Sequence, residues 1–243
     1  MRLRLLTGVA FLFFLPGHTM SFLQGLGQLA DYSGLWGPLA AGFVLGSILW
    51  KFVLSKIPGF ETFEHELTHA LVALLFFRRV TQFHVTRHHG GFVRHLGWFG
   101  GGFGNDMIGL APYFLPTITM ALALFAPWVP DSWKVVFVFF IGITLAYHTF
   151  STIDETIENW STEKVVFGKN NLSGHTDIGR RGYLFSAIVI ASATLALHGL
   201  IWVLLVSGYG GVGEWFRENI EISISFWALL VSWLNGFVSK LMG

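Results

Sequence analysis

The residues that decide the fold run from Phe60 to Val80 and read FETFEHELTHALVALLFFRRV. His65 and His69 are four residues apart, and a helix places residues at that spacing on one face. The run that follows them carries no charge until Arg78. The stretch therefore predicts a membrane-embedded helix that begins at Phe60 or Glu61, and ionisable groups in such a helix are costly enough to indicate a function.

Two imidazoles at this spacing can hold one metal ion, and the intervening Glu66 can accept a proton from a water that the metal activates. We therefore predict His65 and His69 as metal ligands, zinc as the cofactor and Glu66 as the catalytic base. Without a metal, two buried histidines and a buried carboxylate would each need a hydrogen-bonding partner in a medium that offers few.

The composition indicates an integral membrane protein. Of 243 residues, 53% are hydrophobic and only 12% are charged, and the mean hydropathy is +0.61. A soluble domain carries about 25% charged residues. The net charge of +1 gives no basic field for nucleic acid, so we do not expect nucleic acid as a partner. Because the chain has no cysteine, any metal must be bound by His, Asp or Glu.

The hydropathy pattern predicts an all-α polytopic protein with five or six transmembrane helices in a single membrane domain, residues 1–243. We divide it into an N-terminal segment (1–33), a catalytic helical core (34–207) and a C-terminal helix (208–243). Residues 1–20 could be a signal peptide, but we favour a short, shallow helix that is retained. The predicted long spans are residues 34–54, with a Gly42-x-x-x-Gly46 face for close packing, and then 106–128, 133–150, 183–207 and 222–241.

In residues 80–96 apolar and polar residues alternate instead of recurring at helical spacing. This pattern predicts a short β-hairpin with a tight turn at Gly90-Gly91. Its edge could hold an extended substrate by strand addition. Four histidines (His84, His88, His89 and His95) could form a second metal site, but we favour a polar face at the membrane surface. The segment 97–104, GWFGGGFG, lacks the Lys-Ser/Thr of a phosphate loop and predicts a pliable connector. Residues 151–181 form an extended polar segment.

A catalytic zinc site needs three protein ligands and an open position, so one more ligand must come from another helix. Asp177 is our choice because it lies at the mouth of the span 183–207. Its alternative role is that of a helix N-cap. His148 is the second choice, as a ligand or as a group that hydrogen-bonds to the site. The remaining candidates are Asp154, Glu155 and His175, and we expect that replacing Asp154 or Glu155 does not lower metal occupancy.

These features resemble the site-2 proteases and their bacterial relatives, which are zinc metalloproteases of the membrane. The resemblance covers residues 59–186 and rests on His65-Glu66-x-x-His69, the hairpin, Gly109-Leu-Ala-Pro112 and Thr176-Asp177-Ile178. It implies that His65, His69 and Asp177 are the zinc ligands and that Glu66 is the general base. The chain departs from the family pattern because it has no Asn-Pro-x-x-Asp-Gly or Leu-Asp-Gly motif around the aspartate, and no soluble substrate-sorting domain is evident.

Three functions compete at this stage. The first is a multi-pass zinc endopeptidase, in a bacterial inner membrane, that cleaves membrane proteins or membrane-bound peptides within or near the lipid bilayer. The second is a non-catalytic, peptidase-like subunit of a membrane complex. A third is a metal- or haem-binding membrane protein that uses the many histidines, with iron or copper in place of zinc. Basic residues flank both sides of the spans, so loop charge does not decide the orientation.

The last predicted helix carries a stripe of small and polar residues at spacings of three and four. Because helices in a membrane associate through small side chains and polar contacts, this stripe predicts a protein contact, with the catalytic bundle or a partner subunit. The alternative is a helix that lies in the membrane interface. The stripe consists of Ser225, Ala228, Ser232, Asn235 and Ser239.

Overall fold

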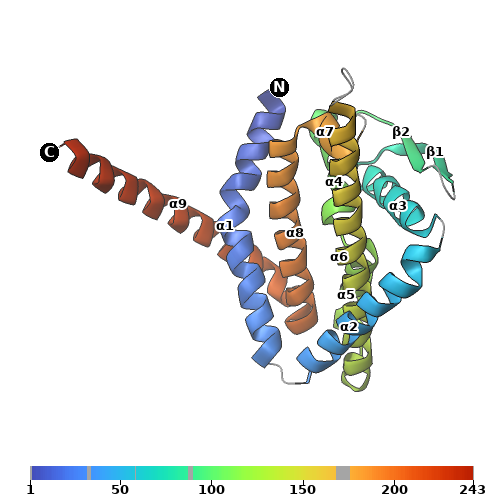
Figure 1. The fold of residues 1–243 in the computed structure, drawn as a ribbon. Coiled ribbons are helices and arrows are strands. Elements are labelled where there is room, and N and C mark those ends of the chain that lie inside the picture. The colour runs from blue at the N-terminus through green and yellow to red at the C-terminus, as the bar shows by residue number, and fades with distance from the viewer. Residues whose placement is uncertain (1, 32–33, 58, 87–89, 168–175, 243) are drawn as a thin grey trace.

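The computed structural model describes residues 2–31, 34–57, 59–86, 90–167 and 176–242, and its elements are labelled in Figure 1. Nine α-helices, three short 3-10 helices and one two-stranded antiparallel sheet are found in these residues, and the α-helices and strands are named below. In chain order they are α1 (Arg2–Asp31), α2 (Trp36–Phe52), α3 (Phe60–Leu75), β1 (Arg79–Val85), β2 (Gly91–Leu96), α4 (Gly101–Phe114), α5 (Thr117–Phe125), α6 (Asp131–Phe167), α7 (Asp177–Arg181), α8 (Tyr183–Val206) and α9 (Val212–Met242).

Within the described residues, five helices are long and apolar enough to cross a membrane: α1, α2, α6, α8 and α9. A sixth span is possible if α4 and α5 count as one, although the two helices meet at 86°. The predicted fold class, an integral membrane protein of five or six spans with a small hairpin, is confirmed. The helix that carries His65 and His69, α3, is not among these spans, because its 16 residues cover only about 24 Å.

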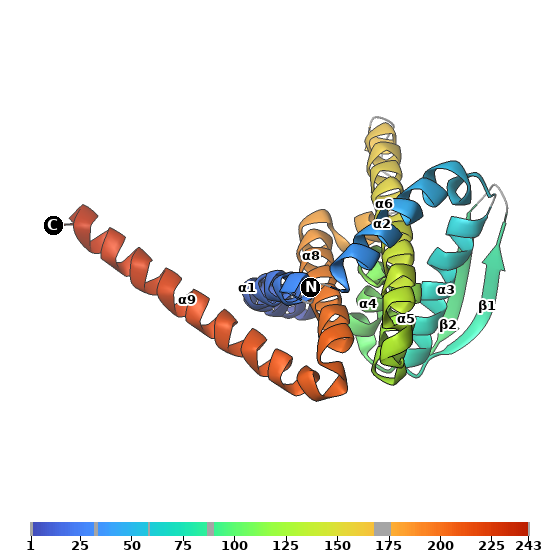
Figure 2. The same cartoon turned by 90° about the horizontal axis from the view of Figure 1, so that it is seen from below.

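The helices form a bundle with the hairpin on one side. In Figure 1, α1 lies along α8, and α2 crosses α6, while α3 and the hairpin occupy the opposite side from α1. The view from below in Figure 2 shows α3 between the hairpin and α4. This arrangement places α3 inside the protein although it is too short to cross a bilayer.

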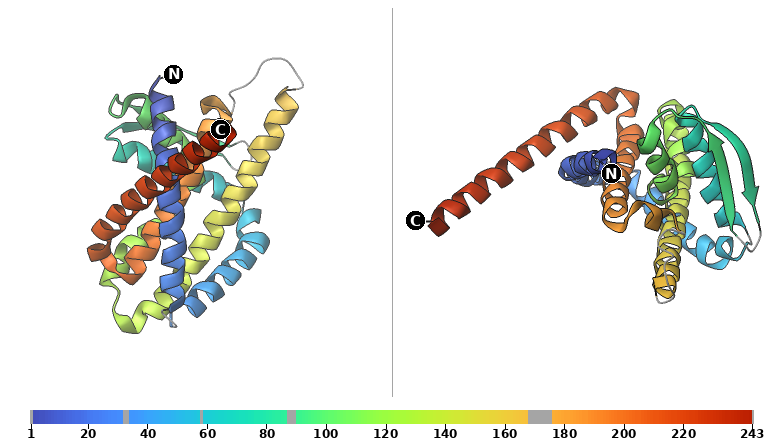
Figure 3. Two further views of the ribbon diagram at one scale, coloured as in Figure 1. Left: turned by 90° about the vertical axis from the view of Figure 1, so that its left-hand side faces the viewer. Right: turned by 90° about the horizontal axis from the view of Figure 1, so that it is seen from above.

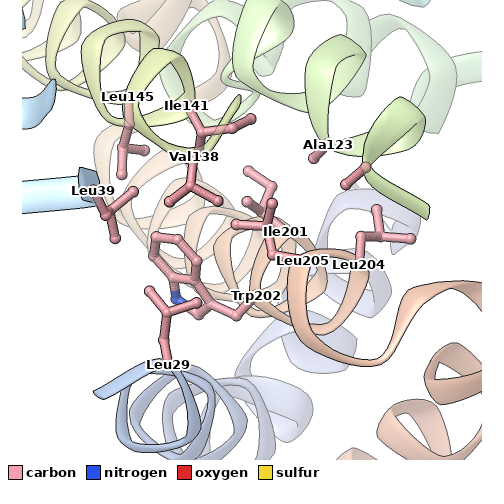
Figure 4. Packing of buried hydrophobic residues seen from close by; sticks show 11 residues of the cluster. Leu29, Leu39, Ala123, Val138, Ile141, Leu145, Ile201, Trp202, Leu204 and Leu205 are labelled. Atoms are coloured by element: carbon pink, nitrogen blue, oxygen red, sulfur yellow. The ribbon is translucent and has the colours of Figure 1, made fainter. Parts of the chain in front are cut away.

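The centre of the bundle is an apolar cluster contributed by five helices. Trp202 of α8 is almost fully buried and lies among Leu29 of α1, Leu39 of α2 and Val138 of α6 (Figure 4). Ala123 of α5 closes the same cluster. These contacts join the N-terminal helix to the spans that follow it.

The predicted glycine face of α2 is confirmed. A Cβ atom on Gly42 would lie 2.0 Å from the carbonyl oxygen of Phe139 in α6, and one on Gly46 would lie 2.6 Å from the carbonyl oxygen of Ile143. Gly142 of α6 meets the backbone of α2 in the same way. Only hydrogen atoms fit at these positions, so the two helices touch through their backbones.

Several predicted boundaries are wrong. The first helix is a full-length candidate span rather than a short, shallow one. The predicted span 106–128 begins earlier, at Gly101, the first residue of α4. It is broken beside Pro116, between Phe114 at the end of α4 and Thr117 at the start of α5. Helix α6 continues to Phe167, so half of the predicted polar segment is helical, and α9 begins at Val212 instead of at residue 222. In α6 and α9 helical hydrogen bonding continues through polar residues that a hydropathy pattern assigns to loops, whereas the break after α4 lies beside Pro116, which has no amide hydrogen to donate.

The hairpin follows α3 directly. Phe77 adopts a left-handed conformation (φ 51°), and the amide of Arg78 donates to the carbonyl of Ala73 at 2.9 Å, a pattern that ends a helix and reverses the chain. Strand β1 then pairs with β2. The connection runs from Thr86 to Gly90, which has a φ of 78°, rather than through a two-residue turn at Gly90-Gly91.

Helix α9 projects away from the bundle in Figures 1 and 2 and in the right-hand view of Figure 3. Its first half touches α1, where the indole of Trp227 donates to the carbonyl of Phe13 at 2.9 Å. Ser225, Ser232 and Asn235 are exposed. The predicted contact of Ser232 and Asn235 with the catalytic bundle is therefore wrong, since the helix has already left the bundle at these residues, and a contact with a partner subunit stays a prediction.

Substituting Gly42 by Ala should lower the free energy of unfolding by about 1–3 kcal/mol, because the added methyl overlaps the backbone of α6. Gly37, also in α2, offers a matched control because a Cβ there meets nothing within 4 Å. Gly37→Ala should leave stability unchanged or slightly higher. Thermal unfolding of both variants in detergent measures this. Equal midpoints for the two variants would contradict the close contact of α2 with α6.

Candidate metal centre

His65 and His69 project from one face of α3, and their Nε2 atoms lie 3.0 Å apart. The Nδ1 atom of His69 lies 2.7 Å from the backbone oxygen of Ile108 in α4. Because a carbonyl can only accept, this Nδ1 carries the proton, and the lone pair of His69 is on Nε2. The helix spacing and one backbone contact together aim a metal-binding nitrogen at the neighbouring histidine.

Asp177 brings a carboxylate to the same point from α7. Its Oδ2 lies 3.3 Å from Nε2 of His69 and 3.8 Å from Nε2 of His65. The alternative role, an N-cap, is filled by Thr176, whose hydroxyl accepts from the amide of Gly179 at 3.1 Å. The side chain of Asp177 is thus left to face the two histidines.

The three atoms match the donor set of a zinc site. In a tetrahedral site with metal–ligand bonds of about 2.0–2.1 Å, neighbouring ligand atoms are about 3.3 Å apart. The observed separations of 3.0, 3.3 and 3.8 Å fall around this value. In the part of the chain that the structure describes, no other group of three His, Asp or Glu residues is close enough to hold a metal. Two imidazoles and one carboxylate leave a fourth position for water or substrate.

Glu66 lies beside this group and is buried. Its Oε2 atom is enclosed and has no hydrogen-bond partner among the residues that the structure describes. Burial raises the pKa of the Glu66 carboxyl, although the charges of His69 and His65 oppose the shift. A buried carboxylate oxygen without a partner is costly unless a ligand or water supplies one. The raised pKa makes this carboxylate a better proton acceptor than an exposed glutamate.

A polar cavity of about 380 Å³ opens onto Glu66, His69 and Asp177. Strand β2 forms one wall, and α4 and α7 form others. Gly91 lies where the strand passes over Glu66, because a Cβ there would be 2.6 Å from Cγ of Glu66. The backbone of β2 therefore lies directly against the side chain of Glu66, the candidate base.

Glu155 has a contact that sequence analysis missed. Its Oε1 atom lies 2.6 Å from Nδ1 of His65, although the ring nitrogen does not point along a well-formed hydrogen bond. A carboxylate behind a metal-bound histidine commonly fixes its ring and raises its basicity. Glu155 lies in α6, within the segment 151–181 that was predicted only as polar, so its placement opposite α3 could not be anticipated.

The other candidates lie elsewhere. His148 is buried in α6, where its Nδ1 is 3.4 Å from the hydroxyl of Thr152 and its ring is near His198. Asp154 is exposed, and His175 is outside the described residues. His148 is not part of the group formed by His65, His69 and Asp177.

Only two of the four hairpin histidines, His84 and His95, lie in the described residues. His84 is exposed, and His88 and His89 are outside the described residues. His95 is half-buried and lines the cavity. Burial lowers the pKa of His95, and the charges of Arg78 and His69 add to the shift, so its ring is neutral at pH 7.

Arg78 joins the hairpin to the start of α4. This almost fully buried guanidinium donates to the carbonyl of Phe99 at 3.0 Å, to that of Gly101 at 2.9 Å and to the side chain of Asn105. The predicted pliability of the glycine-rich connector is wrong, because one arginine binds its carbonyls. The same contacts fix a wall of the cavity, which Asn105 lines.

A family model described as peptidase M50B-like matches residues 39–161, about half of the chain. The protein belongs to the M50B-like family. This confirms the resemblance to the site-2 proteases and indicates a membrane peptidase at the level of the family. The match contains α3, the hairpin and α4, the elements that surround His65 and His69. No curated protein and no solved structure matches the chain.

Asp177→Ala should lower the zinc content of the purified protein, because two ligands hold zinc much more weakly than three. Asp154→Ala is the matched control and should retain full occupancy. Glu155→Gln should give an intermediate loss, through His65 rather than through the metal. Elemental analysis after dialysis against zinc compares the three variants. Full occupancy in Asp177→Ala together with loss in His148→Ala would assign the third ligand to His148.

Proposed function

We propose that this protein is a membrane zinc metallopeptidase of the site-2 protease type, which hydrolyses peptide bonds in or near the membrane. The observation that carries the proposal is the convergence of His65, His69 and Asp177 beside the unpartnered oxygen of Glu66, at the bottom of a polar cavity. Membership of a peptidase family supports the same conclusion.

The residues fit the requirements of the reaction. His65, His69 and Asp177 would hold zinc, which when bound supplies a Lewis acid that polarises a carbonyl and activates water. Glu66 accepts the proton of the attacking water at Oε2 and then delivers it to the nitrogen of the departing amine. Its raised pKa suits both transfers, since a base that is too weak cannot accept the proton and one that is too strong cannot return it.

Strand β2 is suited to hold the substrate in an extended form. A transmembrane helix must be unwound before cleavage, because its carbonyls are bonded within the helix. The amide of Thr86 donates to the carbonyl of Gly90, and bonded pairs alternate along an antiparallel ladder. Phe92 therefore directs its backbone groups towards β1, whereas Val93 directs its own to the outer edge. That edge borders the cavity, so a substrate strand added there would pass the metal ligands.

The other two functions have less support. A non-catalytic subunit would have no use for a buried glutamate with a free oxygen at the metal ligands. A haem or copper protein would need its histidines together, and in the described residues only His65 and His69 join a metal-binding group. The bacterial inner membrane stays a prediction, since the five candidate spans indicate a membrane and not which one.

Glu66→Gln should abolish cleavage while zinc remains bound and the fold stays intact, because glutamine keeps the shape and loses the base. The test follows a panel of single-span transmembrane peptides in vesicles by mass spectrometry, with zinc content measured in parallel. Cleavage by the variant at the parental rate would show that Glu66 is not the base. If the zinc-loaded parent cleaves none of the panel, the result favours the non-catalytic alternative.

Val93→Pro should reduce cleavage at least tenfold without loss of zinc, because proline removes the outward amide that would bind substrate and leaves the bonds to β1 in place. Val93→Ala is the matched control, since it shortens the side chain and keeps the amide. Turnover of the proline variant is compared with that of the alanine variant. Equal rates would mean that substrate does not add to β2.

A further inference from the structure

The carboxylate of Asp177 is held from the side opposite the histidines. The Nη1 atom of Arg181 donates to Oδ1 of Asp177 at 3.1 Å and to its backbone oxygen at 2.6 Å. Oδ1 is thereby occupied, and Oδ2 is the atom directed at His65 and His69. Arg181 thus determines which oxygen of the third candidate ligand faces the metal position.

Arg181 is itself fixed by α4. Its Nη2 atom donates to the backbone oxygen of Asn105 at 3.1 Å, and its Nε lies 3.6 Å from Oδ1 of Asp106. A Cβ on Gly109 would lie 1.5 Å from Nη2 of Arg181. The guanidinium therefore occupies the space that a side chain at Gly109 would fill. This explains why the Gly109-Leu-Ala-Pro112 segment of α4 begins with glycine.

Asp106 connects this arrangement to the N-terminal helix. Its carboxylate is only 2% exposed, and Arg4 of α1 binds both of its oxygens at 2.9 Å. A carboxylate buried to this degree is costly without cationic partners, and here two arginines from different helices supply them. Arg4, Asp106 and Arg181 form a continuous chain of charge from α1 to Asp177.

Helix α1 is also built into the fold along its length. A Cβ on Gly17 would lie 2.2 Å from the backbone oxygen of Asn219 in α9, and one on Gly25 would lie 2.8 Å from Trp202 in α8. The ring of His18 bonds to the hydroxyl of Ser192 in α8 at 2.8 Å. These contacts require α1 in the folded protein.

From this geometry we infer that Arg181, Asp106 and Arg4 are positioning residues for the third metal ligand and that α1 is retained in the mature protein as part of the metal centre. The inference rests on the proposed function, because it takes Asp177 to be a zinc ligand. In this role the three residues act without binding the metal, although Arg181 also lines the polar cavity. They act by holding the Asp177 carboxylate in one orientation.

Removing a group that orients a metal ligand typically costs about 10–100-fold in metal affinity. Arg181→Lys tests the geometry, because lysine keeps the charge and loses the planar fork that reaches Asp177, Asn105 and Asp106 together. Gly109→Ala tests it without altering any charge, since the added methyl displaces the guanidinium. Arg4→Gln tests the distant end of the chain.

The experiment measures the zinc dissociation constant of the full-length protein in detergent, by competition with a chromophoric chelator, together with the unfolding midpoint of the metal-free protein. We expect a 10–100-fold weaker constant for Arg181→Lys and Gly109→Ala and a smaller loss for Arg4→Gln. Arg217→Gln is the matched control. Arg217 also bridges two carboxylates, those of Glu214 and Glu221, but it lies at the exposed start of α9. The zinc affinity of this variant protein should equal that of the parent.

Each outcome is decisive. A lower unfolding midpoint with an unchanged zinc constant in Arg181→Lys and Gly109→Ala would assign these residues a structural role and overturn the inference. An unchanged constant in Asp177→Ala would instead overturn the ligand set of the proposed function. The intact mass of the purified chain tests retention of α1 separately, and a mature chain that begins after Arg4 would overturn that part. Should Arg4→Gln fail to fold, Gly109→Ala and the intact mass still test the inference.

Discussion

The structure depends on the convergence of ionisable side chains in a protein that consists mostly of apolar helices. Two histidines, one glutamate and one aspartate meet at a single point, and each would be costly to bury alone. The cost is offset only if the groups bind one another, a metal or water. Everything around that point serves either to deliver these groups or to hold them: α3 supplies three of them, α7 supplies the fourth, and α4 and the hairpin enclose them.

Glycines determine how closely the elements approach. Gly42 and Gly142 bring the backbones of α2 and α6 into contact, so that α6 runs past α3 and presents Glu155 to His65. Gly91 lets β2 cross directly over Glu66, and Gly109 makes room for Arg181. In each case the missing side chain is replaced by a functional group or a backbone from another element. A methyl group at any of these positions would enlarge the separation between two parts of the candidate site.

Arginine side chains bind buried carbonyl and carboxylate oxygens that water would otherwise have to satisfy. Arg78 binds the carbonyls of the connector before α4, and Arg181 with Arg4 surrounds Asp106. Each guanidinium has several donors in one plane and can therefore satisfy acceptors from more than one element. As a result, the hairpin, α4, α7 and α1 form one connected framework around the cavity. This framework is compatible with a peptidase that must admit water to a small polar region and exclude it elsewhere.

The sequence by itself determined what depends on local pattern. The spacing of His65 and His69 placed them on one helical face, and the apolar runs predicted the membrane and most of its spans. Asp177 could be selected from its place at the start of a span. Only the tertiary structure decided which groups meet across helices: Glu155 against His65, Gly109 against Arg181 and Arg4 against Asp106. These pairs are separated by 72 to 102 positions or lie in segments whose polar composition conceals a helix, as in the second half of α6. Sequence periodicity describes one element at a time, whereas these contacts arise from the packing of several, which no local pattern encodes.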